Sequence, residues 1–520
     1  MPLPYSLSLK KNKEKEKSYF YEGYEMQGFG VRDKIKTSKS MLLQIYYVNL
    51  QLIMNICTKF KIIGCLKYIK MTSKTKTYKD VEIKEYSDLV AEPQYDLFFN
   101  NGNNERQEEG TLRVLSLFSG CGGMDIGLEG GFICHNHSAT KPEWIHRRIN
   151  NDWVQLNRNL FRTVFACDIL EEARLAWLRY MSRYNVNPEI YHLTSIVDLV
   201  KLHKDGGGIF PDNIDIVTGG FPCQDFSVAG KRRGFNSSVS HNGEKREGDS
   251  PSEETRGKLY IWMKQVIDLV RPKMFIAENV KGLVSLGDVK DIIQRDFSAA
   301  NGNDYIVLDP QVLHAANYGV PETRERVIFI GIKRSALRPE AVEALGQKVI
   351  PVEYDPYPKP THNFNVCDET LPAPVTCRDI FTGLPEPADS EDLAQKSYSC
   401  AKYLSNRSQG QTEINFDGLA PTIRSEHHGN IEFRRLSAEH GGKISEELSN
   451  GLAERRLTPR ECALIQTFPP DYPFVFHKAN SKRYAVSPSG AYKIIGNAVP
   501  PMLAYNIARR IQEVWPLYFD

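Results

Sequence analysis

The chain has 520 residues, of which 41% are hydrophobic and 25% charged, so it can form two or three domains with at least one large core. Its formal net charge is only +2, and residues 1–70 carry 13 basic against 5 acidic side chains. The rest of the chain is therefore slightly acidic. This excludes a uniformly basic surface and predicts that any DNA-binding charge is concentrated in a cleft.

The ten cysteines form no CxxC pair, so we expect reduced thiols, with neither a zinc ribbon nor a disulfide framework. We predict no metal site, and we interpret the CHNH stretch at 134–137 as part of a polar surface insertion. The apolar segment 41–66 is interrupted by polar residues and lacks the run of about 20 apolar residues of a membrane span. No signal peptide precedes it. We hypothesise that native synthesis starts at Met71.

From residue 112 onward, strand and helix patterns alternate. An apolar strand, a Gly-rich turn and a helix are predicted in 113–132, a strand in 161–168, and a helix in 171–181. Further strands are predicted before 221, at 274–280 after an amphipathic helix, and at the end of 311–334. This alternation predicts an α/β fold, a doubly wound and mostly parallel sheet.

Composition then changes, which suggests a division into four parts. We predict an N-terminal extension (1–110), a catalytic and cofactor-binding domain (111–335), an irregular Pro- and Gly-rich domain (336–455) and a C-terminal part (456–520). The last part is expected to form two helices, one in 455–469 and one in 491–515, that return to the catalytic domain.

Candidate functional groups follow the strands, because the carboxyl ends of parallel strands meet at one edge of a sheet. The turn 118–123 (FSGCGG) lets backbone approach a ligand, although a tight structural turn explains it nearly as well. Asp168 could accept bonds from ribose hydroxyls, or cap the helix that follows. Cys223 follows a buried strand and could act as a thiolate, whereas an arbitrary cysteine is more often a small buried hydrophobe.

Two further groups have similar alternatives. Glu278 ends an apolar strand, so burial should raise its pKa and suit it to donate a proton, unless it serves a cap or a salt bridge. Arg324 and Arg326 alternate along one strand face and could bind a base or phosphate in a forked geometry, unless they simply face solvent.

Taken together, six motifs resemble the DNA cytosine C5-methyltransferase family of the prokaryotic restriction–modification type: FSGCGG, GGFPCQDFS, ENV, TRERVIFIG, RLTPRECALIQTFP and IIGNAVPP. They occur in the family's order and cover about 113–335 and 456–520. The resemblance implies a Rossmann-like methyltransferase fold, S-adenosyl-L-methionine as cofactor, and double-stranded DNA as the partner. The 336–455 domain would then be the target-recognition domain.

The resemblance also implies roles for single residues. Cys223 would add to C6 of a flipped cytosine, Glu278 would bond N3 and the exocyclic amine, and Arg324 and Arg326 would complete the catalytic set. The cofactor would be surrounded by Phe118, Gly120, Cys121, Gly122, Asp168, Ile196, Pro222, Leu259 and Asn497. The substrate would be contacted by Gln224, Ser227, Arg256, Asn279 and Thr422, and the segment from Ser227 through Arg256 would be the mobile active-site loop.

Several positions depart from the family pattern. Ser195 stands where an Asp usually contacts the adenine, Asp168 is shorter than the usual Glu, and Glu322 replaces the common Gln of the QxRxR motif. An unusually long, basic span between Ile133 and Arg162 could add contacts to the DNA backbone or be a surface excursion, and 236–252 is a second polar insertion.

Two rival functions remain at this stage: an RNA cytosine methyltransferase on the same scaffold, and a catalytically inactive DNA-binding regulator. The sizeable variable domain favours DNA, and the intact Cys223, Glu278 and Arg324 favour catalysis. An unrelated thiol hydrolase is disfavoured because no His lies near Cys223 in sequence. We expect a cytoplasmic, nucleoid-associated monomer without membrane contact, whose cognate restriction endonuclease, if it has one, acts independently.

Overall fold

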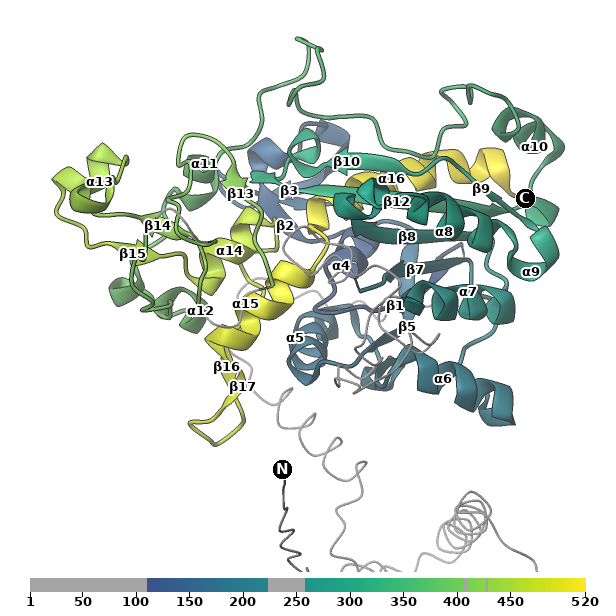
Figure 1. Cartoon of the computed structure of the whole chain (residues 1–520), viewed down its shortest axis with the longest axis horizontal. Helices are drawn as coiled ribbons and strands as arrows, with labels where there is room; N and C mark the ends of the chain where they lie inside the picture. The colour runs from purple at the N-terminus through teal and green to yellow at the C-terminus, as the bar shows by residue number, and fades with distance from the viewer. Residues whose placement is uncertain (1–109, 223–257, 406–408, 426–428) are drawn as a thin grey trace, which may run out of the picture. The chain divides into compact units, whose positions relative to one another are not determined.

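The computed structural model describes residues 110–222, 258–405, 409–425 and 429–520 (Figure 1). Its centre is a sheet in the order β10-β12-β8-β7-β1-β5-β6, with β9 pairing to β12. The bounds are β1 (Leu112–Leu117), β5 (Phe161–Asp168), β6 (Tyr191–Leu193), β7 (Ile216–Gly220), β8 (Met274–Val280), β9 (Tyr305–Val307), β10 (Gln311–His314) and β12 (Glu325–Lys333).

Strands β6, β5, β1, β7 and β8 run parallel, whereas β12 is antiparallel to β8 and β10 antiparallel to β12. The predicted α/β fold with a doubly wound, mostly parallel sheet is confirmed. Since β12 runs in reverse, its first residues lie beside the carboxyl end of β8, where Arg326 pairs with Val280.

Alternate side chains of each strand face two separate apolar cores, as the pleat requires. Val114 packs with α4 (Gly123–Glu129), α5 (Glu171–Met181) and α16 (Pro501–Tyr518) on one face. Leu115 packs with α6 (Ile196–Leu202), α7 (Leu259–Val270) and α8 (Val289–Ser298) on the other. Helices on both faces bury the strands on both sides, which explains their nearly continuous apolar sequences.

The C-terminal part differs from the prediction. A helix was expected to run through 491–515, but two helices form, α15 (Pro488–Asn497) and α16, separated at Ala498 to Pro500. The physical reason is the Pro500-Pro501 pair, because a residue before proline is driven out of the helical region, whereas Pro501 suits the first turn of α16. The helix expected in 455–469 is α14 (Pro459–Ile465), which Thr458 and Glu461 cap reciprocally.

The long span after Phe132 folds into a small antiparallel sheet, order β2-β4-β3, of β2 (Ile133–His135), β3 (Ile145–Arg148) and β4 (Trp153–Leu156). Its Cys134, Trp144 and Val154 join the core on the α16 side. Arg158 and Arg162 were candidates for DNA contacts, but both form ion pairs with the buried Glu129. These two arginines therefore neutralise a buried carboxylate.

The region 336–455 has few regular elements. It contains α10 (Pro339–Leu345), α11 (Cys377–Phe381), α12 (Leu393–Lys396), α13 (Ser445–Ser449), β13 (Ala420–Pro421) and β14 (Phe433–Arg435). Strand β14 pairs with β15 (Arg455–Arg456), which spans the predicted boundary at 455, and β13 pairs in parallel with β11 (Glu322–Thr323) of the catalytic region. The domain boundaries themselves stay a prediction. Among the described residues, no helix is both long and apolar enough to cross a membrane.

Candidate active site

The Gly-rich turn at the end of β1 has a left-handed backbone at three positions, Phe118 (φ 53°), Gly120 (φ 54°) and Gly122 (φ 83°). A side chain at Gly122 would lie 2.6 Å from the ring of Trp177, so this position requires glycine. A side chain at Gly120 would meet no atom of the described residues within 4 Å. The turn therefore packs against Trp177 at Gly122, whereas the described residues leave it uncovered at Gly120. Its backbone at Gly120 can thus approach a ligand.

Buried hydroxyls hold the same turn in place. Tyr191 donates its hydroxyl to the carbonyl of Gly120 (2.9 Å), and Tyr472 donates to that of Cys121 (2.7 Å). The Cys121 thiol is buried and lies 3.3 Å from the carbonyl of Ile494. Cys121 was predicted to bind the cofactor, but its side chain points into the core, so any ligand contact there must be made by its backbone.

Asp168 ends β5 beside the turn. Its Oδ2 accepts a bond from the Gly120 amide (3.0 Å) and its Oδ1 from that of Leu170 (2.9 Å), while burial raises its pKa and these amides oppose the rise. The next residue, Ile169, is 44% exposed although it is large and apolar. Together they place a carboxylate and an uncovered aliphatic surface beside the Gly-rich turn. Sequence reasoning missed Ile169, whose only sign was its place directly after the acid.

The other predicted cofactor residues differ in exposure. Ile196 and Leu259 are 3% and 4% exposed and belong to the apolar core that contains α6 and α7. Ser195 begins α6, where its hydroxyl accepts the Val197 amide. By contrast, Asn497 is exposed at the end of α15 and Pro222 is half-buried after β7. The predicted residues Cys223, Gln224, Ser227 and Arg256, and the 236–252 insertion, lie outside the described residues.

Glu278 is buried near the carboxyl end of β8, and its Oε1 lies 2.7 Å from Nε of Arg326. Burial raises the pKa of Glu278, and the positive charges of Arg326 and Arg324 oppose that rise. The expected raised pKa and the alternative salt bridge are therefore both present. Gly220 stands opposite Glu278 on β7, and a side chain there would come within 2.9 Å of its Oε2. Glycine thus leaves room for the carboxylate.

Asn279 was predicted to contact the substrate, but it is 1% exposed. Its Nδ2 donates to the carbonyl of Phe221 (3.1 Å), and its Oδ1 accepts the Val280 amide (2.9 Å). The side chain therefore fastens β8 to the backbone just before Pro222. In this structure the buried amide holds the segment before Cys223 in place, and the contact of Asn279 with the substrate stays a prediction.

Arg324 also differs from the expected fork onto a base or phosphate, because it is wholly buried. Its guanidinium donates to the carbonyls of Ile423 (2.9 Å), Gly496 (2.9 Å) and Ala498 (2.7 Å). It therefore joins the segment after β13 to the end of α15. Arg326, by contrast, binds the Glu278 carboxylate directly.

Glu322 completes this junction. Its Oε1 accepts the Ile423 amide (2.6 Å) and lies 3.3 Å from Nη1 of Arg324, while Thr422 donates its hydroxyl to the carbonyl of Thr323. Burial raises the pKa of Glu322, and Arg324 opposes the rise. The predicted substrate residue Thr422 thus precedes Ile423, whose backbone bonds both Glu322 and Arg324. Arg324 in turn lies two residues before Arg326, the partner of Glu278.

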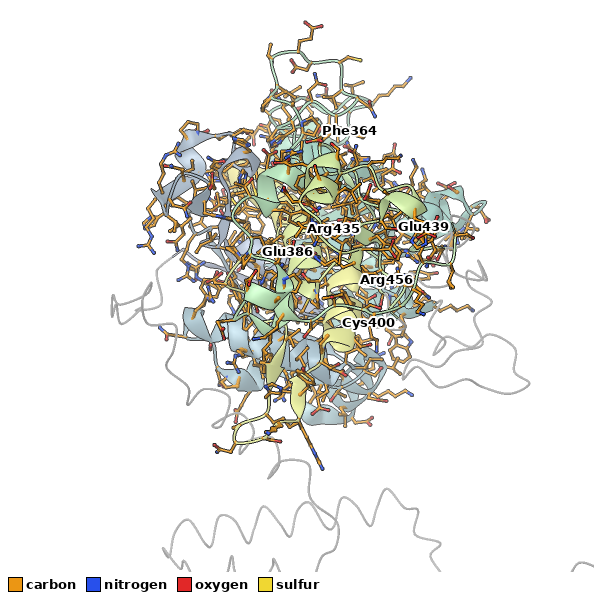
Figure 2. All side chains as sticks on the ribbon, turned by 90° about the vertical axis from the view of Figure 1, so that its left-hand side faces the viewer. Phe364, Glu386, Cys400, Arg435, Glu439 and Arg456 are labelled. Carbon is orange, nitrogen blue, oxygen red and sulfur yellow. The ribbon has the colours of Figure 1, made fainter. Side chains whose placement is uncertain are left out.

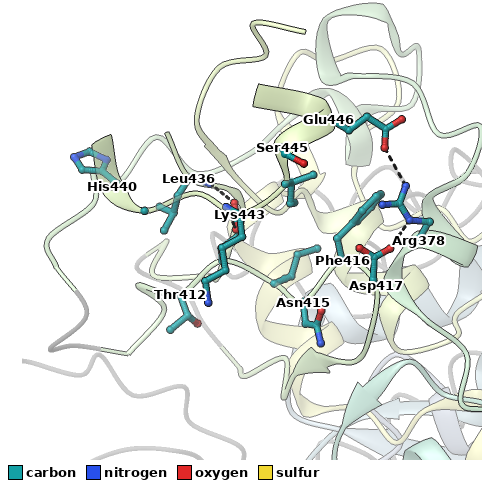
Figure 3. Close-up of a pocket in the computed structure, with 14 residues that line it drawn as sticks. Arg378, Thr412, Asn415, Phe416, Asp417, Leu436, His440, Lys443, Ser445 and Glu446 are labelled. Atoms are coloured by element: carbon teal, nitrogen blue, oxygen red, sulfur yellow. Dashed lines mark hydrogen bonds and ion pairs between the residues drawn. The ribbon is translucent and has the colours of Figure 1, made fainter. Parts of the chain in front are cut away.

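The 336–455 region is held together by buried charges. Figure 2 shows Arg435 and Glu386 within it, where Nη2 of Arg435 lies 2.6 Å from Oε2 of Glu386 and Arg455 binds the same carboxylate. A hollow of about 680 Å³ in this region is lined by Arg378, Asn415, Lys443 and Glu446 among others (Figure 3). None of the described catalytic candidates, Glu278, Arg324 and Arg326, lines it.

Comparison with known proteins identifies this arrangement. A family model described as C-5 cytosine-specific DNA methylase matches residues 112–513. The chain belongs to this family. It is similar to the type II methyltransferase M.BsuRI of Bacillus subtilis, at 29% identity over 78% of this chain and 80% of that protein. It is likewise similar to M.BspRI of Lysinibacillus sphaericus, at 29% identity over 83% and 88% of the two chains. The predicted family and its DNA (cytosine-5-)-methyltransferase activity are confirmed.

Proposed function

We propose that the protein transfers a methyl group from S-adenosyl-L-methionine to C5 of a cytosine flipped out of a specific duplex sequence, through a covalent bond between Cys223 and C6. The observation that carries the proposal is the buried pair of Glu278 and Arg326 at the same sheet edge as the open Gly-rich turn. The relatives named as type II methyltransferases support a role as the modification enzyme of a restriction–modification system. We further propose a monomer that acts independently of any cognate endonuclease.

The described residues fit the cofactor. The turn at Gly120 offers close approach to backbone amides, Asp168 offers carboxylate lone pairs for ribose hydroxyls, and Ile169 offers an apolar surface to a purine ring. When bound, S-adenosyl-L-methionine supplies an electrophilic methyl group. Phe118 and Asn497, exposed or half-exposed at the ends of β1 and α15, are proposed to line the same site.

The chemistry assigned to the protein begins at Cys223. Its thiolate forms a bond to C6, which makes C5 nucleophilic, and C5 takes up the methyl group; the C5 proton is then lost and the S–C6 bond breaks. Glu278 holds N3 and the exocyclic amine, and its raised pKa favours the protonated form that can donate to N3. Arg326 fixes the direction in which Glu278 points.

The first test uses radiolabelled S-adenosylmethionine with mixed-sequence duplex DNA, matched RNA, and the variants Cys223→Ala and Cys400→Ala. Cys400 is an exposed cysteine in the 336–455 region and serves as the matched control. We expect label in DNA as 5-methylcytosine, lost only in Cys223→Ala. Label in RNA alone would support an RNA methyltransferase, and DNA binding without any label would support a regulator.

The covalent step has its own test. A duplex with 5-fluorocytosine at the mapped target has no C5 proton to lose, so the S–C6 bond cannot break after methyl transfer. We expect a denaturation-resistant protein–DNA adduct with the wild type and with Cys400→Ala, and none with Cys223→Ala. Methylation of ordinary DNA without any trapped adduct would refute the covalent step.

A further inference from the structure

A basic hairpin precedes α15. Strands β16 (Phe476–His477) and β17 (Tyr484–Val486) pair antiparallel, and their connecting loop projects away from the central sheet (Figure 1). The rings of His477 and Tyr484 stack across the two strands, with centroids 4.6 Å apart. The Lys478 amide donates to the carbonyl of Arg483 (2.9 Å), so the loop is closed by its own backbone.

The charge of this hairpin is of one sign. No Asp or Glu occurs in the sequence between Asp471 and Glu513. Lys482 and Arg483 are exposed at the loop, and neither side chain has an ion-pair partner among the residues that the structure describes. Tyr484 beside them is 42% exposed. The loop thus presents two cations and an aromatic ring, a combination that suits phosphate groups.

Helix α15 relates this loop to the active site. Ser487 caps its first turn, directly after the hairpin, and Gly496 near its other end lies against the backbone of Arg424 and accepts a bond from Arg324. Ten helical residues span about 15 Å, and the arms of the hairpin add about 10 Å. The loop is therefore about 15–25 Å from the Arg324 junction, which corresponds to about four to seven base pairs of duplex.

We propose that Lys482 and Arg483 form a second DNA contact, which binds the phosphate backbone about four to seven base pairs from the target cytosine and reads no base. The inference rests on the proposed action on duplex DNA. Phosphates follow one another about every 3.4 Å along a strand of B-form DNA, so several of them lie within reach of the loop. A contact to phosphate alone adds affinity without sequence preference. Because it is electrostatic, it should also be salt-dependent.

The test compares wild type with Lys482→Ala/Arg483→Ala. A control variant, Arg334→Ala/Lys348→Ala, removes the same charge from exposed residues around α10. Binding and methylation are measured separately on a long duplex and on one ending about three base pairs from the target. We expect the hairpin variant to weaken binding to the long duplex only. Losing two phosphate contacts makes the fall of log K with log[salt] less steep by about 1.8. The loss of affinity relative to wild type should therefore be about tenfold greater at 50 mM than at 200 mM salt.

Equal salt slopes for the hairpin variant and wild type on the long duplex would overturn the inference. So would an equal loss in the control variant, which would mark a general effect of net charge, or an equal loss on the short duplex. If the hairpin variant shows the lowered salt slope but the wild type methylates neither duplex, the proposed function is refuted and the second contact is still supported, since the two are read out independently.

Discussion

Glu278 is the residue whose environment says most about the reaction. Its carboxyl group is buried, its pKa is raised, and Arg326 holds one oxygen at 2.7 Å. We expect Glu278→Gln to lower kcat by about 10²–10⁴-fold, because the amide cannot transfer a proton to N3. Glu325→Gln, which removes a half-exposed carboxylate paired with Lys281, is the matched control. Single-turnover methylation measures both, and equal losses would contradict the assigned role.

The pH dependence follows from the same pKa. If the protonated form of Glu278 is the active one, its contribution is full at low pH and is lost as the pH rises through the raised pKa of this group. The wild-type rate should therefore fall on the alkaline side of that pKa, and the residual rate of Glu278→Gln should not. An identical alkaline limb in the variant would assign that limb to another group.

Gly220 makes a second prediction at the same scale. A methyl group there would stand 2.9 Å from Oε2 of Glu278, so the flexible carboxylate must move. We expect Gly220→Ala to keep the fold but lower kcat by roughly 100-fold, the cost of a displacement of about 1 Å in a catalytic group. Gly346→Ala, at a surface helix end, is the control. A normal kcat in Gly220→Ala would show that Glu278 needs no fixed position.

Sequence predicted these residues unequally. The apolar run around Glu278 predicts burial and a raised pKa directly, because both are local properties of one strand. The burial of Arg324 could not be predicted in this way, since its three carbonyl partners come from Ile423, Gly496 and Ala498, distant in sequence. For the same reason Asn279 and Cys121 looked like ligand contacts although their partners lie within the protein.

At the scale of elements, the short pairing of β11 with β13 joins the 336–455 region to the catalytic strands. Burial raises the pKa of Glu322 in this pair, with Arg324 opposing. A raised pKa means that stability is greatest below the unfolded value and is lost as the pH rises through the folded one. Glu322→Gln lacks this titration, so the stability of wild type relative to the variant should fall as the pH rises above about 4.3.

A measurement of activity distinguishes the loss of this titration from a disruption of the contacts that Glu322 makes with Ile423 and Arg324. Gln is the residue common in the family at this place, and its amide oxygen can still accept the Ile423 amide. We expect kcat of Glu322→Gln to change less than about tenfold, which is about 1.4 kcal/mol in the barrier. Denaturant titrations across pH give the stability difference. A relative stability that is flat or rises with pH would contradict the assigned ionisation.

Elements were predictable where a period or a breaker decides the structure. The strands β1, β5, β7 and β8 and the helix α5 follow from apolar runs and a helical period. Pro500-Pro501 also encodes the break between α15 and α16. The apolar helical period continues across this pair, however, and so predicts a single helix. The sheet β2-β4-β3 was not predicted, because its strands are short and their partners are set by packing against α16.

At the scale of the whole molecule, charge is buried where the fold has little regular structure. Arg435 in the 336–455 region and Arg456 just after it are both buried (Figure 2). Arg435 and Arg455 share the carboxylate of Glu386. A slightly acidic body with no large basic excess can therefore hold several arginines that never meet DNA. Counting charges along the sequence cannot separate these from the exposed pair at Lys482 and Arg483.

This network makes acid stability a property of the 336–455 region. Burial alone would raise the pKa of Glu386, but hydrogen bonds from Arg435 and Arg455 lower it to about 2. A lowered pKa gives stability that is present above the unfolded value and lost as the pH falls through the folded one. Wild type should therefore lose stability between about pH 4.3 and the pKa of about 2 in the fold.

The stability of Glu386→Gln should change less with pH across that window. This variant should also be about 2 kcal/mol less stable than wild type at neutral pH, because bonds to a charged acceptor are lost. Glu439→Gln, an exposed carboxylate of the same region, should match wild type throughout. Thermal unfolding followed by circular dichroism measures all three, and parallel pH profiles for wild type and Glu386→Gln would mean that the arginines are held by other carboxylates.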